Sequence, residues 1–296
     1  MSDHTGVLAR PGEAEAAADA AAGAAGVRVR VLTELSELRQ VDRLFSAIWR
    51  PDPATPLVTP ELLRALSKAG SYVAGAFDDS GMVGACVGFF APPAQRELHS
   101  HIAGVAPAAM GRSVGRALKL HQRAWALGHG VDTVTWTFDP LVSRNAYFNL
   151  VKLGGVPVQY LTDFYGGMQD GVNGGDDTDR LLVRWELAAP RVRQAGAGVV
   201  PRWSVADLTC SGAVIGLDRS PDGEPVPGRP DGDTVLVAVP PDVEALRRTD
   251  AARARRWRLA VRETLGTLLA EGATVQGFDR AGWYVVTRPA RDGGTS

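Results

Sequence analysis

The feature that most constrains the fold of this chain is a strand, a glycine-containing turn and a long helix in direct succession. Residues 100–105 form an apolar run typical of a strand, and an amphipathic stretch ending near Gly128 predicts a helix. Gly111 and Gly115 lie in the turn between them. The first N–H groups of a helix have no partner inside the helix, and the helix dipole favours negative charge there. The turn therefore predicts an anion site, for which phosphate is the obvious ligand.

Two other phosphate-binding loops do not fit this turn. The sequence contains no Gly-x-x-x-x-Gly-Lys-Ser/Thr motif, which excludes the loop of P-loop nucleotide hydrolases. Gly111, Ser113 and Gly115 do not give the dinucleotide-binding spacing. The order of the neighbouring elements also argues against a doubly wound sheet.

Hydrophobic periodicity predicts a mixed α+β domain around the turn. The predicted strands are residues 27–32, 72–77, 82–90, 100–105, 131–138, 156–164 and 180–187. The predicted helices are residues 35–49, 59–70, the stretch ending near 128, and 145–153. Their order along the chain is β-α-α-β-β-β-α-β-α-β-β.

The turn resembles the acyl-CoA pyrophosphate loop of the GNAT superfamily of N-acyltransferases. The motif of that loop reads Arg/Gln-x-x-Gly-x-Gly/Ala, and the segment from Met110 to Gly115 stands in its place. Met110 and Ser113 depart from the motif. The order of the predicted elements is also the GNAT order.

Segments further along the chain extend the resemblance. Ala146, Lys152 and Gly154 match the spacing of an Ala-x-x-x-Tyr-x-Lys-x-Gly helix, in which Leu150 stands at the tyrosine position. Several other segments are similar to a poorly characterised bacterial branch of predicted GNAT acyltransferases, and together the resemblance covers residues 27–289. These segments are residues 136–141, 144–146, 163–166, 179–185 and 256–258 with the strands that follow.

The resemblance implies a GNAT-like mixed central sheet flanked by helices, with an additional C-terminal β-α-β-β lobe. It implies acyl-CoA as co-substrate, acetyl-CoA or succinyl-CoA, and no metal. In that fold the pantetheine arm inserts where two parallel strands separate, here residues 100–105 and 131–138. The residues implied in cofactor binding are Ala103, Gly104, Val105, Met110, Gly111, Arg112, Ser113, Val114, Gly115, Arg116, Asn145 and Phe148.

Attack of an amine on a thioester requires a proton acceptor for the amine and an acid for the leaving thiolate. His101 is the best titratable candidate on strand 100–105, and alternation predicts that it shares a face with the residues two and four positions further on. Tyr165 is a candidate acid because Leu150 removes the usual phenol, and Asp163 is a candidate base through water or ligand of the acceptor ammonium. The alternatives are a packed histidine, a tyrosine that satisfies a backbone group, and a turn aspartate.

Arg144, Tyr160 and Arg180 are candidates for substrate binding. A guanidinium group pairs bidentately with a carboxylate, so either arginine suits an acidic acceptor or a dicarboxylic acyl group. The alternative is a surface arginine or a structural pair with Asp139.

The rest of the chain is predicted to comprise a leader, a linker, a lobe and a tail. The expected divisions are a disordered Ala/Gly-rich leader over residues 1–26, the acyltransferase domain over 27–187, a linker over 188–202, an α+β lobe over 203–289 and a tail over 290–296. The lobe contains a helix over about residues 250–270. One face of that helix is predicted to pack on the body through Trp257, Val261 and Leu268. The opposite face carries arginines expected to be solvated, or to bind the 3′-phosphate of CoA, namely Arg255, Arg258 and Arg262.

Composition limits the classes of partner. The formal net charge of −1 does not indicate a nucleic-acid partner. No apolar run reaches the length of a membrane span and no signal peptide is recognised, so we expect a cytoplasmic protein without a membrane partner. Cys86 and Cys210 match no metal spacing and are expected to be reduced, packed thiols. The expected partner is a small-molecule amine, and a homodimer is left open.

Two functions from different classes remain open on the sequence. The first is an acyl-CoA-dependent N-acyltransferase that moves an acetyl or succinyl-type group to the amine of a small molecule, such as an amino acid, by direct attack. The second is a catalytically degenerate GNAT-fold module that binds acyl-CoA without turnover. Met110, Ser113, Leu150 and the absence of the usual catalytic carboxylate on strand 100–105 favour the second function.

Overall fold

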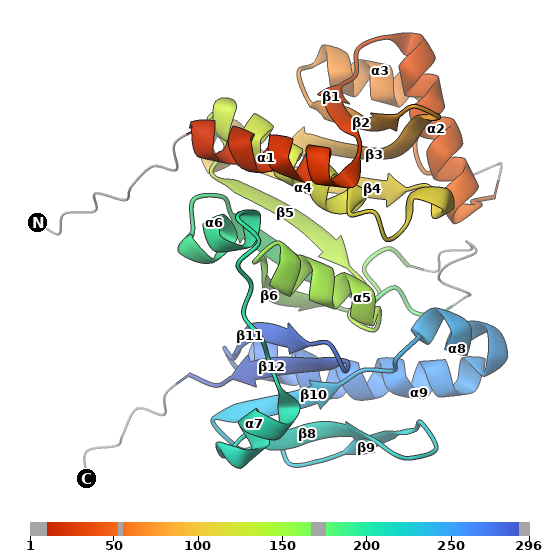
Figure 1. Cartoon of the computed structure of the whole chain (residues 1–296). Helices are drawn as coiled ribbons and strands as arrows, with labels where there is room; N and C mark the ends of the chain where they lie inside the picture. Colours follow the sequence, from red (N-terminus) through yellow and green to blue (C-terminus); the bar gives the residue numbers. More distant parts are fainter. Residues whose placement is uncertain (1–10, 53–55, 167–175, 290–296) are drawn as a thin grey trace, which may run out of the picture. The chain divides into compact units, whose positions relative to one another are not determined.

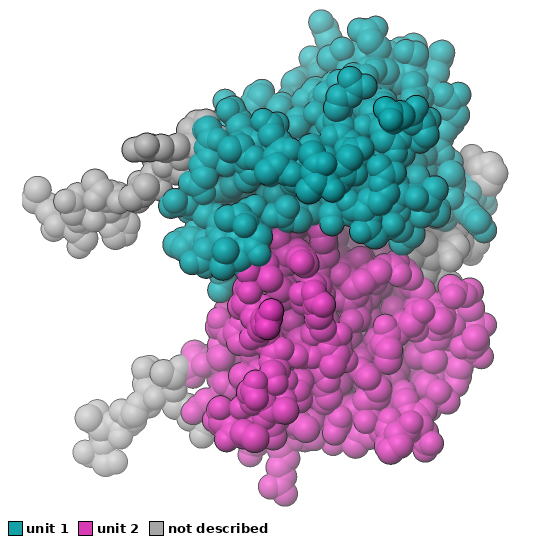
Figure 2. Space-filling model, in the orientation of Figure 1, with its two compact units in different colours: residues 1–136, 185–199 teal, residues 137–184, 200–296 magenta. Residues whose placement is uncertain are grey.

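The computed structural model describes residues 11–52, 56–166 and 176–289. The chain divides into two compact units, shown in different colours in Figure 2. Unit 1 consists of residues 1–136 and 185–199, and unit 2 consists of residues 137–184 and 200–296. The divisions fall inside two strands, β5 (Thr133–Phe138) and β7 (Arg180–Glu186). Each unit is described by itself below.

Unit 1 is built on a mixed β-sheet in which β1 to β5 lie in sequence order. The first four strands pair antiparallel in turn, and they are β1 (Arg28–Val31), β2 (Tyr72–Asp78), β3 (Gly81–Phe90) and β4 (Glu97–Val105). β4 and β5 pair parallel. A parallel pair needs a crossover connection, which α4 (Val114–Gly128) provides. The mixed sheet and the element order confirm the predicted α+β fold class.

Helices cover both faces of this sheet (Figure 1). α2 (Leu35–Trp49) and α3 (Pro60–Lys68) pack on one face, where Phe45 and Val87 belong to the same buried apolar cluster. Cys86, the neighbour of Val87 along β3, instead contacts Gln122 of α4. Successive residues of a strand point to opposite faces, so α4 lies on the face away from α2.

The residues expected to be a disordered leader form a packed helix over the part that the structure describes. α1 (Pro11–Ala25) lies along α4 (Figure 1). Its contact stripe consists of alanines spaced by four, three and four residues, all at most 5% exposed, namely Ala14, Ala18, Ala21 and Ala25. Alanine has the highest helix propensity, and its small side chain allows two helices to approach closely. Low complexity in this segment therefore marks a tight helix contact rather than disorder.

The predicted linker also contains a packed helix. α6 (Pro190–Gly196) buries Val192 and Ala195 within unit 1. Arg116 of α4 donates hydrogen bonds to the carbonyl oxygens of Ala195 and Gly196, at 3.1 and 2.7 Å. Proline suits the first turn of a helix because its missing N–H group would have no partner there. The proline at the start of this segment thus begins a helix.

Unit 2 contains an antiparallel strand pair and a second, five-stranded sheet. The pair is β6 (Val156–Leu161) with the part of β7 that lies in unit 2. The second sheet has the order β11-β12-β10-β8-β9. Its strands are β8 (Val214–Arg219), β9 (Pro225–Pro227), β10 (Thr234–Ala238), β11 (Thr274–Asp279) and β12 (Trp283–Thr287). This sheet confirms an additional α+β region at the C-terminal end, and β8 and β9 enlarge the predicted β-α-β-β arrangement.

Two helices of unit 2 continue into π-helical segments, and the others are short. They are α5 (Ser143–Ala146) followed by a π-helical segment over Tyr147–Lys152, α7 (Val205–Cys210), α8 (Val243–Thr249), and α9 (Ala251–Val261) followed by a π-helical segment over Arg262–Gly266 and α10 (Thr267–Ala270). Trp257, Val261 and Leu268 are at most 1% exposed, as predicted for the packed face. Arg258 is fully buried, so the predicted solvated arginine face is wrong at this residue.

Short 3₁₀ helices occupy Pro93–Gln95 and Pro107–Ala109.

The predicted state of the two cysteines can be compared with the structure. Cys86 and Cys210 are both free thiols, but only Cys86 is buried, so the expectation that both are packed is wrong for Cys210. Within residues 11–52, 56–166 and 176–289, no helix combines the length and apolarity needed to cross a bilayer.

The two compact units divide the chain differently from the predicted boundaries at residues 187 and 203. Residues 137–184 are grouped with the C-terminal region in unit 2. One reason is visible at Tyr284 of β12, whose hydroxyl donates to the carbonyl oxygen of Pro140 at 2.8 Å. Buried ion pairs of Asp139 with Arg247 and Arg258 also join residues 137–184 to the C-terminal region.

Candidate functional site

The anion loop, which we define as residues 106–115, carries a set of backbone N–H groups without partners. Gly111 and Ser113 both have positive φ angles, 81° and 64°, which turn the chain sharply before α4 begins at Val114. Glycine adopts such angles without strain, whereas serine does so at a cost. At the end of this loop, over residues 111–115, four amides have no acceptor among the described residues. They belong to Gly111, Ser113, Val114 and Gly115.

The two arginines of this segment are used elsewhere in unit 1. Arg112 pairs with Asp78 at 2.7 Å and also donates to the carbonyl oxygens of Ala25 and Gly26, which end α1. Hydrogen bonds from Ser80 and from Arg112 lower the pKa of the Asp78 carboxyl to about 2. Arg116 binds α6, as described above. The free groups of the anion loop are therefore backbone amides, and both predicted arginines have structural partners.

The parallel strands β4 and β5 separate beside the anion loop. Their pairing joins residues 97–99 with residues 133–135, and the last pair is His99 with Thr135. Further along β4, Ala103, Gly104 and Val105 pair with β3 only, within the described strand pairings. On the β5 side, this stretch therefore has no paired strand within the described pairings, and the resemblance implies that a cofactor arm binds there.

A β-bulge changes the predicted placement of His101. Val87 pairs with Ile102 and Gly88 with Ser100, so His101 is the extra residue of the bulge. The strict alternation assumed for residues 101, 103 and 105 therefore fails at this position. The bulge places the His101 ring 5.8 Å from the Phe89 ring and 6.4 Å from the His99 ring, measured between centroids.

Both histidines of β4 favour the neutral form. Partial burial lowers the pKa of His99 and of His101 below the ordinary 6.5. The positive charge of a neighbouring imidazole and of Lys119 lowers the His99 value further, while Glu97 opposes the shift. A neutral imidazole near pH 7 accepts a proton, so either ring has the chemistry required of a base.

Lys119 of α4 contacts residues of β4 and β5 near the point where these strands begin to separate. Its Nζ atom donates to Ser100 Oγ at 3.0 Å and to Gln122 Oε1 at 2.6 Å. It also lies 4.0 Å from the Trp136 ring centroid, a distance typical of a cation–π contact. Ser100 and Trp136 directly follow the last strand pair. Burial lowers the pKa of Lys119 to about 8. Sequence reasoning missed this lysine because the helical pattern places it among apolar residues without an acidic partner.

In unit 2, the Asp163 carboxylate takes part in a turn. Its Oδ1 atom accepts hydrogen bonds from the Thr178 N–H at 3.0 Å and from the Thr178 hydroxyl at 3.1 Å. Asp163 itself has a φ angle of 43°, which aspartate tolerates better than most residues. This geometry favours the turn role over the catalytic role.

Tyr165, the other predicted catalytic residue of unit 2, keeps an accessible side chain. It is 42% exposed, and its hydroxyl lies 3.0 Å from Thr137 Oγ1. The Arg180 guanidinium lies 5.2 Å from the ring centroid. Arg180 also donates to the Asp179 carbonyl oxygen at 2.9 Å, and burial lowers the pKa of its guanidinium.

The other candidates of unit 2 have close partners inside the chain. Tyr160 donates to Asp179 Oδ2 at 2.7 Å, and burial together with this carboxylate raises the pKa of the phenol. Arg144 makes a bidentate pair with Glu244, at 2.5 and 2.6 Å, in place of the Asp139 pair considered from the sequence. Asn145 and Phe148 are half-buried, and Leu150 is buried. Two substrate-binding candidates thus bind carboxylates of this chain.

A buried Asp–Arg network explains the arginines of α8 and α9. The network consists of Asp139, Asp176, Arg247 and Arg258, whose side chains are at most 8% exposed. Arg258 binds both oxygens of Asp139 at 2.8 Å. Burial opposes ionisation of Asp139, but the two arginines outweigh it and hold the pKa of this carboxyl well below its usual range. This network was not predicted from the sequence. Two features could have indicated it, the acidic segment over residues 176–179 and the arginine-rich helix.

Arg262, at the end of the same helix, is also paired. It binds Asp179 and Asp177 at 2.6 and 2.7 Å, and these bonds raise the pKa of its guanidinium. Arg255 is 3.8 Å from Asp177 and largely exposed. The predicted role of these arginines as a solvated face is therefore wrong for two of the three.

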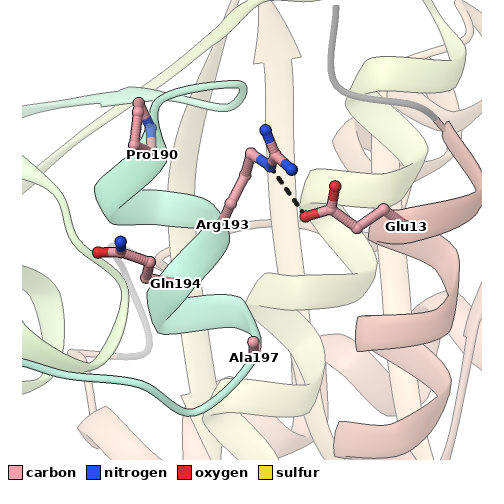
Figure 3. A pocket seen from close by; sticks show the side chains of 5 residues that line it. All are labelled: Glu13, Pro190, Arg193, Gln194 and Ala197. Atoms are coloured by element: carbon pink, nitrogen blue, oxygen red, sulfur yellow. Dashed lines mark hydrogen bonds and ion pairs between the residues drawn. The ribbon is translucent and has the colours of Figure 1, made fainter. Parts of the chain in front are cut away.

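A shallow hollow of about 370 Å³ lies between α1 and α6 (Figure 3). Its lining residues are Glu13, Pro190, Arg193, Gln194 and Ala197. Arg193 Nε binds Glu13 Oε1 at 3.1 Å across it. The hollow shares no residue with the anion loop or with the histidines of β4, and it lies outside the candidate site.

Among known proteins, only solved structures show similarity to this chain. No protein-family model and no curated protein matches the sequence. The chain is similar to a protein assigned to the GNAT family of acetyltransferases from Desulfovibrio desulfuricans, at 19% identity and a TM-score of 0.44, over 54% of this chain and 99% of that one. It is also similar to ribosomal-protein-S18-alanine N-acetyltransferase from Escherichia coli, at 13% identity and a TM-score of 0.44, over 55% and 95%. A third example is an N-acetyltransferase from Staphylococcus aureus Mu50. Its sequence identity is 14% and its TM-score is 0.43, over 54% of this chain and 98% of that one. These similarities concern the fold of about half of the chain.

Proposed function

We propose that this protein is an acyl-CoA-dependent N-acyltransferase that moves an acetyl or succinyl-type group to the amine of a small molecule by direct attack. The anion loop carries the proposal: four backbone amides without acceptors follow a strand that separates from its parallel neighbour. A pyrophosphate needs several converging donors, and a helix N-terminus adds a favourable dipole. The open backbone groups of Ala103 to Val105 suit an extended amide-containing arm.

The chain's own residues then divide the work as follows. The amides of the anion loop hold the pyrophosphate, and a backbone N–H of the open stretch of β4 polarises the thioester carbonyl. A neutral imidazole of β4, His101 or its neighbour His99, accepts the ammonium proton of the acceptor. Acyl-CoA supplies the activated acyl group. Tyr165 is the proposed acid for the leaving thiolate because its hydroxyl is accessible and Leu150 has no proton to give.

A binding module without turnover is the second candidate function. The observation that favours it is the buried Leu150 at the position where the resemblance expects a phenol. Mass spectrometry of the purified protein for a bound CoA thioester, followed by an assay of CoA thiol release with acetyl-CoA or succinyl-CoA and a panel of amines, separates the two. Amine-dependent thiol release supports the transferase. Tight CoA binding with no release for any amine would establish the binding module.

A further inference from the structure

Three side chains on adjoining parts of β4 and β5 form a chain of hydrogen bonds. The Thr135 hydroxyl donates to Glu97 Oε1 at 2.9 Å. The same hydroxyl oxygen lies 3.4 Å from His99 Nδ1. Glu97 and His99 share a face of β4 because they are two residues apart, and Thr135 is the cross-strand partner of His99. The three groups therefore meet at the last strand pair before β4 and β5 separate.

Counting protons assigns a tautomer to His99. A carboxylate is an acceptor without a proton of its own, so the bond between Thr135 and Glu97 uses the hydroxyl proton. The Thr135 oxygen is then left as an acceptor toward His99. A neutral imidazole carries one N–H group, and a bond to this oxygen requires that N–H at Nδ1. The Nε2 atom of His99 is consequently left with a free lone pair.

The surroundings of His99 keep the ring available as a base. The titratable and charged groups around it are His101 and Glu97 on its own strand and Lys119 on α4. Its ring also lies 5.3 Å from the ring of Phe89 on β3, between centroids. His101 lies in the bulge, and within the described residues no hydrogen bond holds its ring. Of the two histidines of β4, His99 is therefore the one in which hydrogen bonding determines which ring nitrogen lacks a proton.

We propose that His99 is the proton acceptor of the acyl-transfer site, and that Thr135 and Glu97 are positioning residues that keep its Nε2 atom unprotonated. This inference rests on the proposed function. His99 Nε2 takes one proton from the acceptor ammonium, the free amine forms the C–N bond at the thioester carbonyl, and the C–S bond breaks. Tyr165, the proposed acid, protonates the leaving thiolate, and the second amine proton restores the phenol. The proton held by His99 is released to solvent.

Long-range ¹H–¹⁵N spectra of the imidazole rings test the positioning claim on the protein alone, without CoA or acceptor. Such spectra distinguish a protonated ring nitrogen from a bare one. The wild-type protein should show His99 with the proton at Nδ1. Thr135→Val should move the proton to Nε2 in part or in full, while Thr135→Ser, which keeps the hydroxyl, should retain the wild-type tautomer. A wild-type His99 with its proton at Nε2, or an unchanged tautomer in Thr135→Val, would overturn the claim.

Steady-state kinetics test whether the fixed tautomer serves the reaction. His99→Gln should lower turnover by about 10²- to 10⁴-fold, the usual worth of a general base, and should do so more than His101→Gln. Thr135→Val should lower turnover about tenfold or more and shift the acidic limb of the pH profile, with little change in KM for acyl-CoA, and Thr135→Ser should recover most of the loss. Equal turnover in His99→Gln and wild type would overturn His99 as the acceptor. If the spectra agree but the wild-type protein transfers no acyl group to any amine, the proposed function fails while the tautomer assignment stands.

Discussion

The anion loop of unit 1 and the predicted substrate residues of unit 2 differ in how many of their polar groups already have partners. Over residues 111–115 of the anion loop four backbone amides have no acceptor among the described residues, and burial favours the neutral form of the histidines of β4. In unit 2, Arg144 and Tyr160 already bind carboxylates of the same chain. Unsatisfied donors near a helix N-terminus favour binding of an anion, whereas paired guanidinium groups mainly contribute to the fold.

Residue type alone therefore does not identify a binding residue. Arginine is the usual candidate for binding phosphate or carboxylate, yet the arginines of the anion loop and of α9 serve structural contacts. Backbone amides, which carry no residue-type signal, are the free donors.

The largest expected effect concerns Tyr165, the accessible phenol of unit 2. Tyr165→Phe removes the hydroxyl and keeps the ring, so turnover should fall by about 10²- to 10⁴-fold while CoA affinity stays near the wild-type value. Tyr147→Phe is the matched control, because the Tyr147 hydroxyl accepts a hydrogen bond from Arg280 Nε at 2.9 Å. Wild-type turnover in Tyr165→Phe would eliminate it as the acid and leave Tyr160, Tyr147 or a water.

The Asp–Arg network should dominate the stability of unit 2. Arg258→Met leaves Asp139 and Asp176 buried with one arginine fewer, and breaking a buried pair in this way costs about 3–5 kcal/mol of unfolding free energy. Arg255→Met removes a largely exposed arginine and should cost less than about 1 kcal/mol. Urea denaturation of the two variants measures the contrast. Equal losses would show that the network does not stabilise the fold.

Lys119 should make the stability of unit 1 depend on alkaline pH. Its pKa is about 8 when folded and near 10.5 when unfolded, so the unfolded chain binds more protons between these values. Stability should therefore rise with pH from about 8 to 10.5, by up to about 3 kcal/mol from this group. The rise is measured as the difference between wild type and Lys119→Met in urea denaturation at pH 8 and pH 10. The same pH dependence in both proteins would mean that Lys119 keeps an ordinary pKa.

The smallest effect is expected at Arg144. Its guanidinium is 59% exposed and pairs with Glu244, so Arg144→Ala should change the unfolding free energy by less than about 1 kcal/mol. If the pair is only structural, KM for the amine acceptor should also stay within about twofold of wild type. A large rise in KM without loss of stability would return Arg144 to the acceptor site and weaken the contrast between the two regions.

The order of elements and the anion loop were predictable because they depend on local signals. Periodicity located the strands and helices of residues 27–187, and the strand–turn–helix pattern located the free amides. α1 was missed because an alanine stripe has little hydrophobic contrast, although its spacing of three and four residues marks one helix face. The predicted domain boundaries at residues 187 and 203 stay a prediction. The compact units group residues 137–184 with the C-terminal region.

The partners of charged side chains were not predictable, because they lie far apart in the sequence. Asp139 and Arg258 are separated by 119 positions, and no local pattern links them. The bulge at His101 was missed for a different reason. Strand alternation assumes regular pairing, and a single extra residue shifts every later side chain to the other face.

Titration of CoA into the wild-type protein and into Gly115→Glu tests the central claim, that the amides of the anion loop hold the pyrophosphate. A bulky acidic side chain at Gly115 should block close approach of the backbone and repel the anion, so CoA affinity should fall about 100-fold or more. Arg112→Lys, which changes a side chain turned toward Asp78 and α1, should lose far less. Unchanged CoA affinity in a Gly115→Glu protein whose circular dichroism and thermal unfolding match the wild type would contradict the account.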